Sequence, residues 1–121
     1  MLNFFRCFLD PGLFDQGLDF AVREWSRRDR HVRKRIDMAD SRRLTAITVM
    51  FRRFGYSAYD ADVRARILYF MQLGYHALDQ TEPLPERLKR AEGYLVGFTG
   101  AEPRPGEVDA FRAYALEKAA M

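Results

Sequence analysis

Two residues with polar head groups, Gln72 and His76, lie inside the apolar stretch from Ile67 to Leu78. A pocket for a small molecule needs a few such groups to orient its ligand. A buried histidine that forms a hydrogen bond to a neighbouring helix is at least as common in folded proteins. Both a ligand-binding role and a packing role are therefore open for this pair.

The sequence offers little for catalysis or metal binding. It contains one cysteine and two histidines. It has no His-x-x-x-His or Cys-x-x-Cys pair, no glycine-rich phosphate loop and no recognisable Ser/His/Asp spacing. Cys7 with His31 or His76 is a conceivable thiol pair, but a lone cysteine among phenylalanines normally packs in a core. We expect no enzymatic activity, no cofactor and no metal.

The positive charge of the chain is concentrated in one segment. Between Arg23 and Arg43 there are nine Lys or Arg and four Asp or Glu residues, whereas the whole chain carries a net charge of only +3. Such a segment attracts phosphates. Its arginines are expected to spread around the helices without interleaved aromatic side chains, so a solvated face is the preferred interpretation. Within it, Arg33–Asp37 and Asp40–Arg43 have the spacing of structural ion pairs.

The composition indicates one soluble helical domain spanning residues 1–121. The chain is 48% hydrophobic and 31% charged, which is typical of a globular protein. Its longest apolar helical part is about twelve residues, too short for a bilayer, which needs about twenty. The opening "MLNFFRCFL" is not a convincing signal peptide, because Arg6 interrupts it and no basic region precedes it. We expect a cytoplasmic protein that does not contact a membrane.

The apolar spacing predicts an all-α fold, an orthogonal or antiparallel bundle of about five helices, with no strand-like alternation. Asp29 and Ser57 are expected N-caps, and Gly55 is expected to end a helix in the left-handed conformation. The predicted helices cover residues 15–28, 30–54, 58–80, 84–98 and about 107 onward.

Four of these helices carry an apolar stripe that is expected to be buried. In the helix 15–28 it consists of Leu18, Ala21, Val22 and Trp25. In the helix 30–54 it consists of Val32, Ile36, Ala39, Ile47, Met50 and Phe54. In the helix 84–98 it consists of Leu84, Leu88, Ala91, Leu95 and Phe98, and in the last helix of Val108, Phe111, Ala115 and Ala119.

The helix 58–80 is apolar on nearly every side, so it must be covered on all sides. The helix 84–98 follows a short loop and is expected to lie antiparallel to it. The two preceding helices cover another flank, and a second copy of the chain is the best explanation for the remaining one. Gly74 costs about 1 kcal/mol relative to alanine inside a helix, which close approach of another helix or a ligand can offset.

Two segments, "REWSRRDRHVRKRIDMADSRRL" and "FRRFGYSAYDADVRARILYFMQLGY", resemble the C-terminal domain of TetR-family transcriptional regulators. The similarity covers about residues 13–98 and leaves 101–121 as a C-terminal extension helix. The residues that carry it are Asp40, Arg43 and Leu44, then Phe51 to Gly55, then Ala61, Arg64, Ala65 and Arg66, and finally Gly74.

The resemblance implies a homodimer in which the helices 58–80 and 84–98 form a four-helix bundle with their mates. The expected interface residues are Gly74, Leu78, Leu84, Leu88, Ala91, Leu95 and Phe98. It also implies a cavity for a small apolar or aromatic effector, whose lining we expect to include Trp25, Met50, Phe54, Tyr69, Gln72 and His76.

The N-terminal helix-turn-helix unit of that family has no counterpart, because about twelve residues precede the similar region and cannot form three helices. The resemblance therefore predicts a ligand-sensing and dimerisation domain that contacts DNA only through a missing N-terminal unit. Met1 to Leu9 would be the remnant of the helix entering it. One alternative is a stand-alone basic helical protein that binds nucleic acid through residues 23–43. Another is a module that pairs with full-length regulators.

Overall fold

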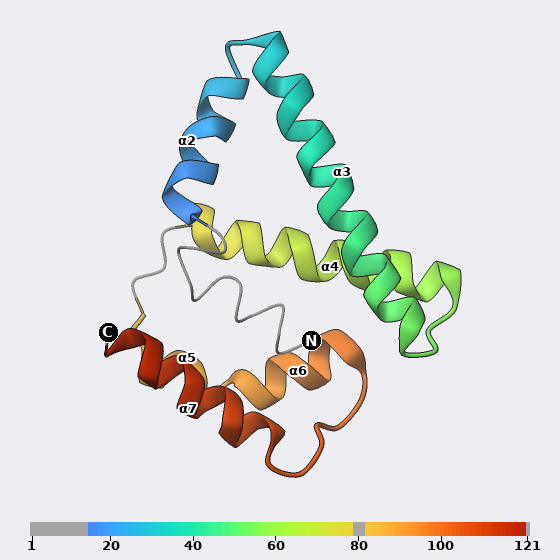
Figure 1. Cartoon of the computed structure of the whole chain (residues 1–121), viewed down its shortest axis with the longest axis vertical. Helices are drawn as coiled ribbons and strands as arrows, with labels where there is room; N and C mark the ends of the chain where they lie inside the picture. Colours follow the sequence, from blue (N-terminus) through green and yellow to red (C-terminus); the bar gives the residue numbers. More distant parts are fainter. Residues whose placement is uncertain (1–14, 79–81, 121) are drawn as a thin grey trace. The chain divides into compact units, whose positions relative to one another are not determined.

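The computed structural model describes residues 15–78 and 82–120, and all regular structure in these two ranges is helical. The helices are α2 (Gln16–Ser26), α3 (Arg30–Arg53), α4 (Ala58–Ala77), α5 (Leu84–Leu88), α6 (Ala91–Thr99) and α7 (Glu107–Ala119) (Figure 1). The all-α prediction is confirmed. None of the described helices has the length and apolar character needed to cross a membrane.

The chain divides into two compact units. The N-terminal unit spans Gly17–Asp79 and contains α2, α3 and α4. The C-terminal unit contains α5, α6 and α7 within its described residues 82–120. We describe each unit by itself.

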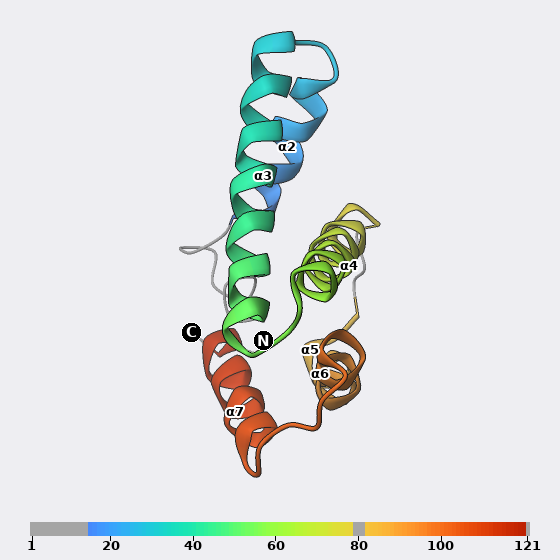
Figure 2. The same ribbon diagram turned by 90° about the vertical axis from the view of Figure 1, so that its right-hand side faces the viewer.

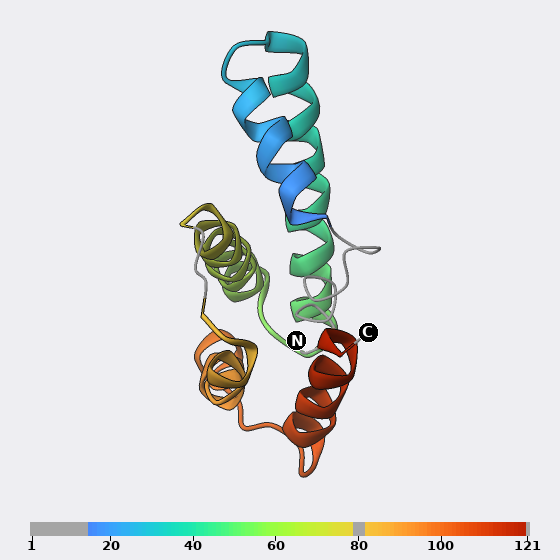
Figure 3. The ribbon, with the colours of Figure 1, turned by 90° about the vertical axis from the view of Figure 1, so that its left-hand side faces the viewer.

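In the N-terminal unit the three helices outline a triangle, with α4 crossing the C-terminal half of α3 (Figure 1). The side views show α2 and α3 in one layer and α4 on one side of it (Figure 2, Figure 3). The caps predicted from the sequence are present. The Asp29 carboxylate accepts hydrogen bonds from the backbone N–H groups of His31 and Val32, and Ser57 accepts one from Asp60. Gly55 has φ +91°, as expected for the residue that ends α3.

The packing of α3 against α4 forms the apolar core of this unit. Ile47 and Phe51 are buried on α3, and Ala61, Ala65 and Leu68 are buried on α4. The two alanines have no side chain beyond Cβ, so the helices can approach closely.

Part of the predicted stripe of α3 is wrong at its C-terminal end. Ile36 and Ile47 are buried as expected, but the next buried side chain is Phe51, which the sequence analysis did not include. Phe54 is exposed because α3 ends at Arg53 and the chain turns away at Gly55.

The orientation predicted for α2 is also wrong. Leu18 and Trp25, expected to be buried, have exposed fractions of 62% and 59%. The opposite side of α2, with Asp19, Arg23 and Ser26 at spacings of four and three, is the side that faces inward. Ion pairs from this side to α3 outweigh the apolar pattern that the sequence displays.

In the C-terminal unit the predicted helix 84–98 is broken into α5 and α6 by a turn at Lys89 and Arg90. The guanidinium Nε of Arg112 on α7 donates a hydrogen bond to the carbonyl oxygen of Leu88 at 3.0 Å. This bond satisfies a carbonyl group that an unbroken helix would have used internally.

The predicted seam of α5 and α6 packs against α7. The cluster of buried residues is Leu88, Ala91, Leu95, Val108, Phe111 and Ala115, with Leu84 packed against it. The apolar positions of the last helix were therefore predicted correctly, except for Ala119, which is exposed. The last helix is thus part of the core of this unit.

Candidate functional site

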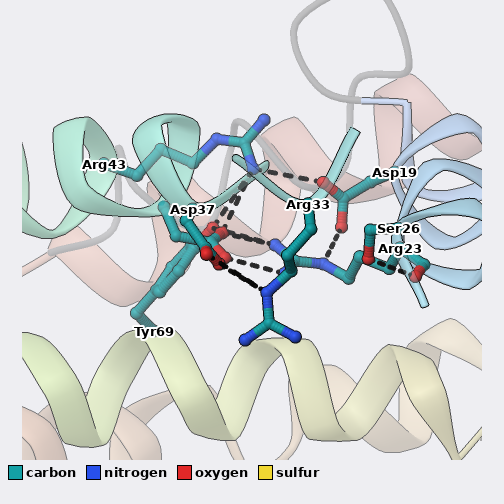
Figure 4. A network of polar contacts seen from close by, with 8 residues as sticks. Asp19, Arg23, Ser26, Arg33, Asp37, Arg43 and Tyr69 are labelled. Atoms are coloured by element: carbon teal, nitrogen blue, oxygen red, sulfur yellow. Dashed lines mark hydrogen bonds and ion pairs between the residues drawn. The ribbon is translucent and has the colours of Figure 1, made fainter. Parts of the chain in front are cut away.

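A polar network joins the three helices of the N-terminal unit (Figure 4). We define it by its five residues, Asp19 and Arg23 of α2, Asp40 and Arg43 of α3, and Tyr69 of α4. It contains two carboxylates and two guanidinium groups, so its charges balance around the phenol of Tyr69.

Asp40 lies at the centre of the network. Its carboxylate accepts hydrogen bonds from both terminal nitrogens of Arg23, at 2.9 and 2.6 Å. The Tyr69 hydroxyl donates a third bond to Asp40 Oδ1 at 2.6 Å. Bidentate pairing of an arginine with a carboxylate fixes the relative orientation of the two groups as well as their distance. Asp40 therefore determines how α2 and α4 lie against α3.

Asp19 and Arg43 form the second half of the network. Arg43 Nη1 donates to Asp19 Oδ1 at 3.1 Å and to the Tyr69 hydroxyl at 3.1 Å. Asp19 also accepts from Arg23 Nε at 2.8 Å. Each arginine thus bridges two helices, and Tyr69 receives a further bond from Arg23 Nη2 at 3.2 Å.

The environment of the network shifts the pKa values of its members. Burial alone would raise the pKa of Asp40, but hydrogen bonds from Arg23 and Tyr69 hold that pKa below its ordinary value. The pKa of Tyr69 is raised, first by burial and then by its hydrogen bond to Asp40. The pKa of Arg23 is raised, chiefly by its hydrogen bond to Asp40. These shifts keep Asp40 and Arg23 charged and the phenol of Tyr69 neutral at neutral pH.

Sequence reasoning found only part of this network. It predicted an Asp40–Arg43 ion pair of structural role, and the closest oxygen and nitrogen atoms of these side chains lie 3.8 Å apart. Their shorter contacts are to α2 and α4. The part of the network on α2 could have been suspected from the spacing of four between Asp19 and Arg23, which places both side chains on one face of α2.

The residues predicted to line an effector cavity lie in different environments. Tyr69 and Gln72 are buried, Met50 and His76 are partly buried, and Trp25 and Phe54 are exposed. Tyr69 serves the polar network. Of three surface clefts formed by described residues of this unit, none is lined by any of the six.

Gln72 and His76 form a pair on α4. The side-chain amide nitrogen of Gln72 lies 2.9 Å from Nε2 of His76. Gln72 is buried, and the imidazole ring also meets the ring of Tyr75 edge-on at 5.7 Å. The two polar groups therefore already satisfy one another within one helix, and the ligand-binding role stays a prediction.

One side of α4 is apolar and largely exposed within the described chain, and Phe70 at its edge also borders a cleft between α4 and α3. Phe70 and Leu78 have exposed fractions of 53% and 73%, and Ile67 is as exposed as Phe70. Gly74 lies on the same side, and a methyl group added there would meet nothing within 4 Å. The close approach expected at Gly74 is therefore not made by the residues that the structure describes. We name Ile67, Phe70, Gly74 and Leu78 the outer face of α4.

No group of three or more His, Cys, Asp or Glu side chains that could hold a metal ion exists among the described residues. The third cleft, of about 560 Å³, lies between α3 and α4 and is bordered by Leu44, Thr48, Val49 and Phe70 with acidic residues at its rim. The other two clefts border the basic segment and are lined largely by Arg and Lys.

A comparison with protein-family models finds no match, and searches of curated proteins and of solved structures likewise find none.

Proposed function

We propose that this chain is the ligand-sensing and dimerisation domain of a TetR-like transcriptional regulator, and that two copies associate through the outer face of α4. The observation that carries the proposal is the uncovered apolar surface of this face. The class of protein is proposed from the resemblance of residues 13–98 to the C-terminal domain of that family.

The outer face of α4 has the chemistry of an interface between subunits. From Ile67 to Leu78 the helix contains no Asp, Glu, Lys or Arg. Fully burying a side chain of the size of Phe70 or Leu78 stabilises by about 1.5–3 kcal/mol. Gly74 leaves room for a helix of a second copy to approach closely.

Contacts within the C-terminal unit reduce the set of residues that we propose for the dimer interface. Leu88, Ala91 and Leu95 were predicted from the sequence to lie at the dimer interface, but they pack against α7 within their own chain. The proposal therefore places Gly74 and Leu78 at the dimer contact and gives Leu88, Ala91 and Leu95 a role in the core. Homodimer formation itself stays a prediction.

The proposed effector is a small apolar or aromatic molecule. The polar groups that an apolar molecule with one polar substituent would engage beside α4 are Gln72 and His76, which would exchange their mutual hydrogen bond for one to the ligand. Thermal-shift measurements with small aromatic compounds test this, and Gln72→Leu should remove the stabilisation by any compound that binds there.

Sedimentation velocity tests the dimer. We expect the native chain to sediment as a dimer at micromolar concentration and Phe70→Asp to sediment as a folded monomer. Leu116→Asp is the matched control, because Leu116 is a half-exposed leucine on α7 in the other unit. A native chain that stays monomeric at high concentration, or a Phe70→Asp variant that still dimerises, contradicts the proposal.

A further inference from the structure

We propose that the outward side of α3 in its N-terminal half, together with the turn before it, binds the phosphate backbone of duplex nucleic acid. The proposal concerns a surface separate from the outer face of α4, and it does not depend on dimerisation.

The structure separates the basic residues of this segment into two groups. Arg23 and Arg43 point inward and are neutralised by Asp19 and Asp40, and Arg33 is paired with Asp37 at 2.9 Å. A second group is exposed and has no carboxylate within ion-pairing distance among the described residues. We name this group the basic face: Arg28, Arg30, Lys34, Arg35 and Arg42.

The basic face lies away from the core of its unit. Ile36 and Ile47 mark the buried side of α3, and with 3.6 residues per turn Lys34 lies about 160° around the helix from Ile36. The distance along α3 from Arg30 to Arg42 is about 18 Å. The arginines were expected to spread around the helices. In the structure, the cations of α3 that have no carboxylate partner in the described part of the chain instead lie on the side away from Ile36 and Ile47.

Two clefts run between these cations. One, of about 750 Å³, is lined by Arg28, Arg30 and Lys34 together with Arg27, Arg33 and two aspartates. The other, of about 580 Å³, is lined by Lys34, Arg35 and Arg42 with His31, Met38 and Ala39. The surface is therefore grooved and cationic, so an extended anion can lie between the side chains.

The chemistry of the basic face favours a duplex over other polyanions. No Phe, Tyr or Trp occurs from Arg27 to Arg43, so the face lacks the aromatic platforms on which single-stranded bases stack. Met38 is its one exposed large apolar side chain among the described residues, so it lacks the apolar stripe that inserts into a lipid surface. A row of cations on a rigid helix matches a phosphate backbone, and contacts to phosphates give affinity without sequence preference.

Fluorescence anisotropy with a labelled duplex of arbitrary sequence, titrated with the full chain at several salt concentrations, tests the proposal. If all five cations contact phosphates, the slope of log K against log salt is about −4.5. The affinity then falls about 500-fold between about 50 and about 200 mM salt. Replacing two of the five, as in Arg35→Glu with Arg42→Glu, should reduce the slope to about −2.7 or less in magnitude.

The matched control is Lys89→Glu with Arg104→Glu, which makes the same change in net charge on exposed residues of the C-terminal unit. Circular dichroism should show that both double variants stay helical. The expected result is weakened binding only for the Arg35/Arg42 variant. Equal weakening by the control, or no binding of the native chain at about 50 mM salt, would overturn the proposal. Tighter binding of the matching single strand, or of vesicles containing phosphatidylserine, would overturn the choice of a duplex.

Discussion

Removing the hydroxyl group of Tyr69 tests whether the polar network holds α2, α3 and α4 together. Tyr69→Phe deletes the bond to Asp40 at 2.6 Å and the bonds received from Arg23 and Arg43 at 3.2 and 3.1 Å. Hydrogen bonds to charged groups stabilise by about 1.5–3 kcal/mol. Asp40 keeps its contact with Arg23, and Arg43 keeps Asp19. No charge is then left unpaired, and we expect a loss near the middle of that range.

Urea unfolding at neutral pH, followed by circular dichroism, measures this loss, because all regular structure in the described residues is helical. Tyr59→Phe is the control, because Tyr59 lies on the same helix with an exposed fraction of 81%. It should change the free energy of unfolding by less than about 0.5 kcal/mol.

A double-mutant cycle that combines Tyr69→Phe with Asp40→Asn measures the coupling energy between these two residues, and so tests whether they act as one network. Residues that share a hydrogen-bond network are coupled by about 0.5–3 kcal/mol. We expect Asp40→Asn and Tyr69→Phe to be coupled within that range. The reasoning is refuted if the two effects add within about 0.3 kcal/mol, or if Tyr69→Phe unfolds at the same urea concentration as the native chain.

Three further predictions follow from the same structure. Folding lowers the pKa of Asp40, so its contribution to the free energy of unfolding is complete above the unfolded pKa of about 4 and is lost as the pH falls through the lower folded pKa. The free energies of unfolding of the native chain and of Asp40→Asn, measured as the pH is lowered, should therefore converge. Gly74→Ala meets open space within the chain, so it should raise the free energy of unfolding by up to about 1 kcal/mol while weakening any dimer measured by sedimentation; an unchanged dimer would contradict close approach at this residue. Asp29→Ala removes the N-cap bonds of α3 and should cost about 1 kcal/mol in thermal unfolding, whereas Asp29→Asn should cost little.

The helix ends of the N-terminal unit were predictable because they depend on local chemistry. Asp29, Gly55 and Ser57 act on backbone groups within three residues of themselves. Their residue types therefore carry the information directly.

The orientation of α2 was not predictable in the same way. It depends on Asp19 and Arg23 meeting Asp40, Arg43 and Tyr69, which are 17 or more residues away along the chain. The apolar spacing of Leu18 and Trp25 favoured burial of their side of α2, but it carries no information on the distant partners of Asp19 and Arg23. The break between α5 and α6 was not predictable for the same reason. The carbonyl group of Leu88 at this break is satisfied by Arg112, which lies 24 residues further along the chain.

The completeness of the polar network also bears on the proposed effector. The carboxylate of Asp40 accepts three hydrogen bonds, and the carboxylate of Asp19 accepts two. Both terminal nitrogens of Arg23 are already bonded to Asp40. An anionic ligand that took over these nitrogens would displace the carboxylate and leave a partly buried charge without its partner, which is strongly unfavourable. An apolar molecule imposes no such loss, because it competes for the apolar surfaces of α4 and leaves the ion pairs intact. We therefore expect that charged small molecules do not bind at the polar network, and that any compound which binds the apolar surfaces of α4 leaves the effect of Tyr69→Phe unchanged.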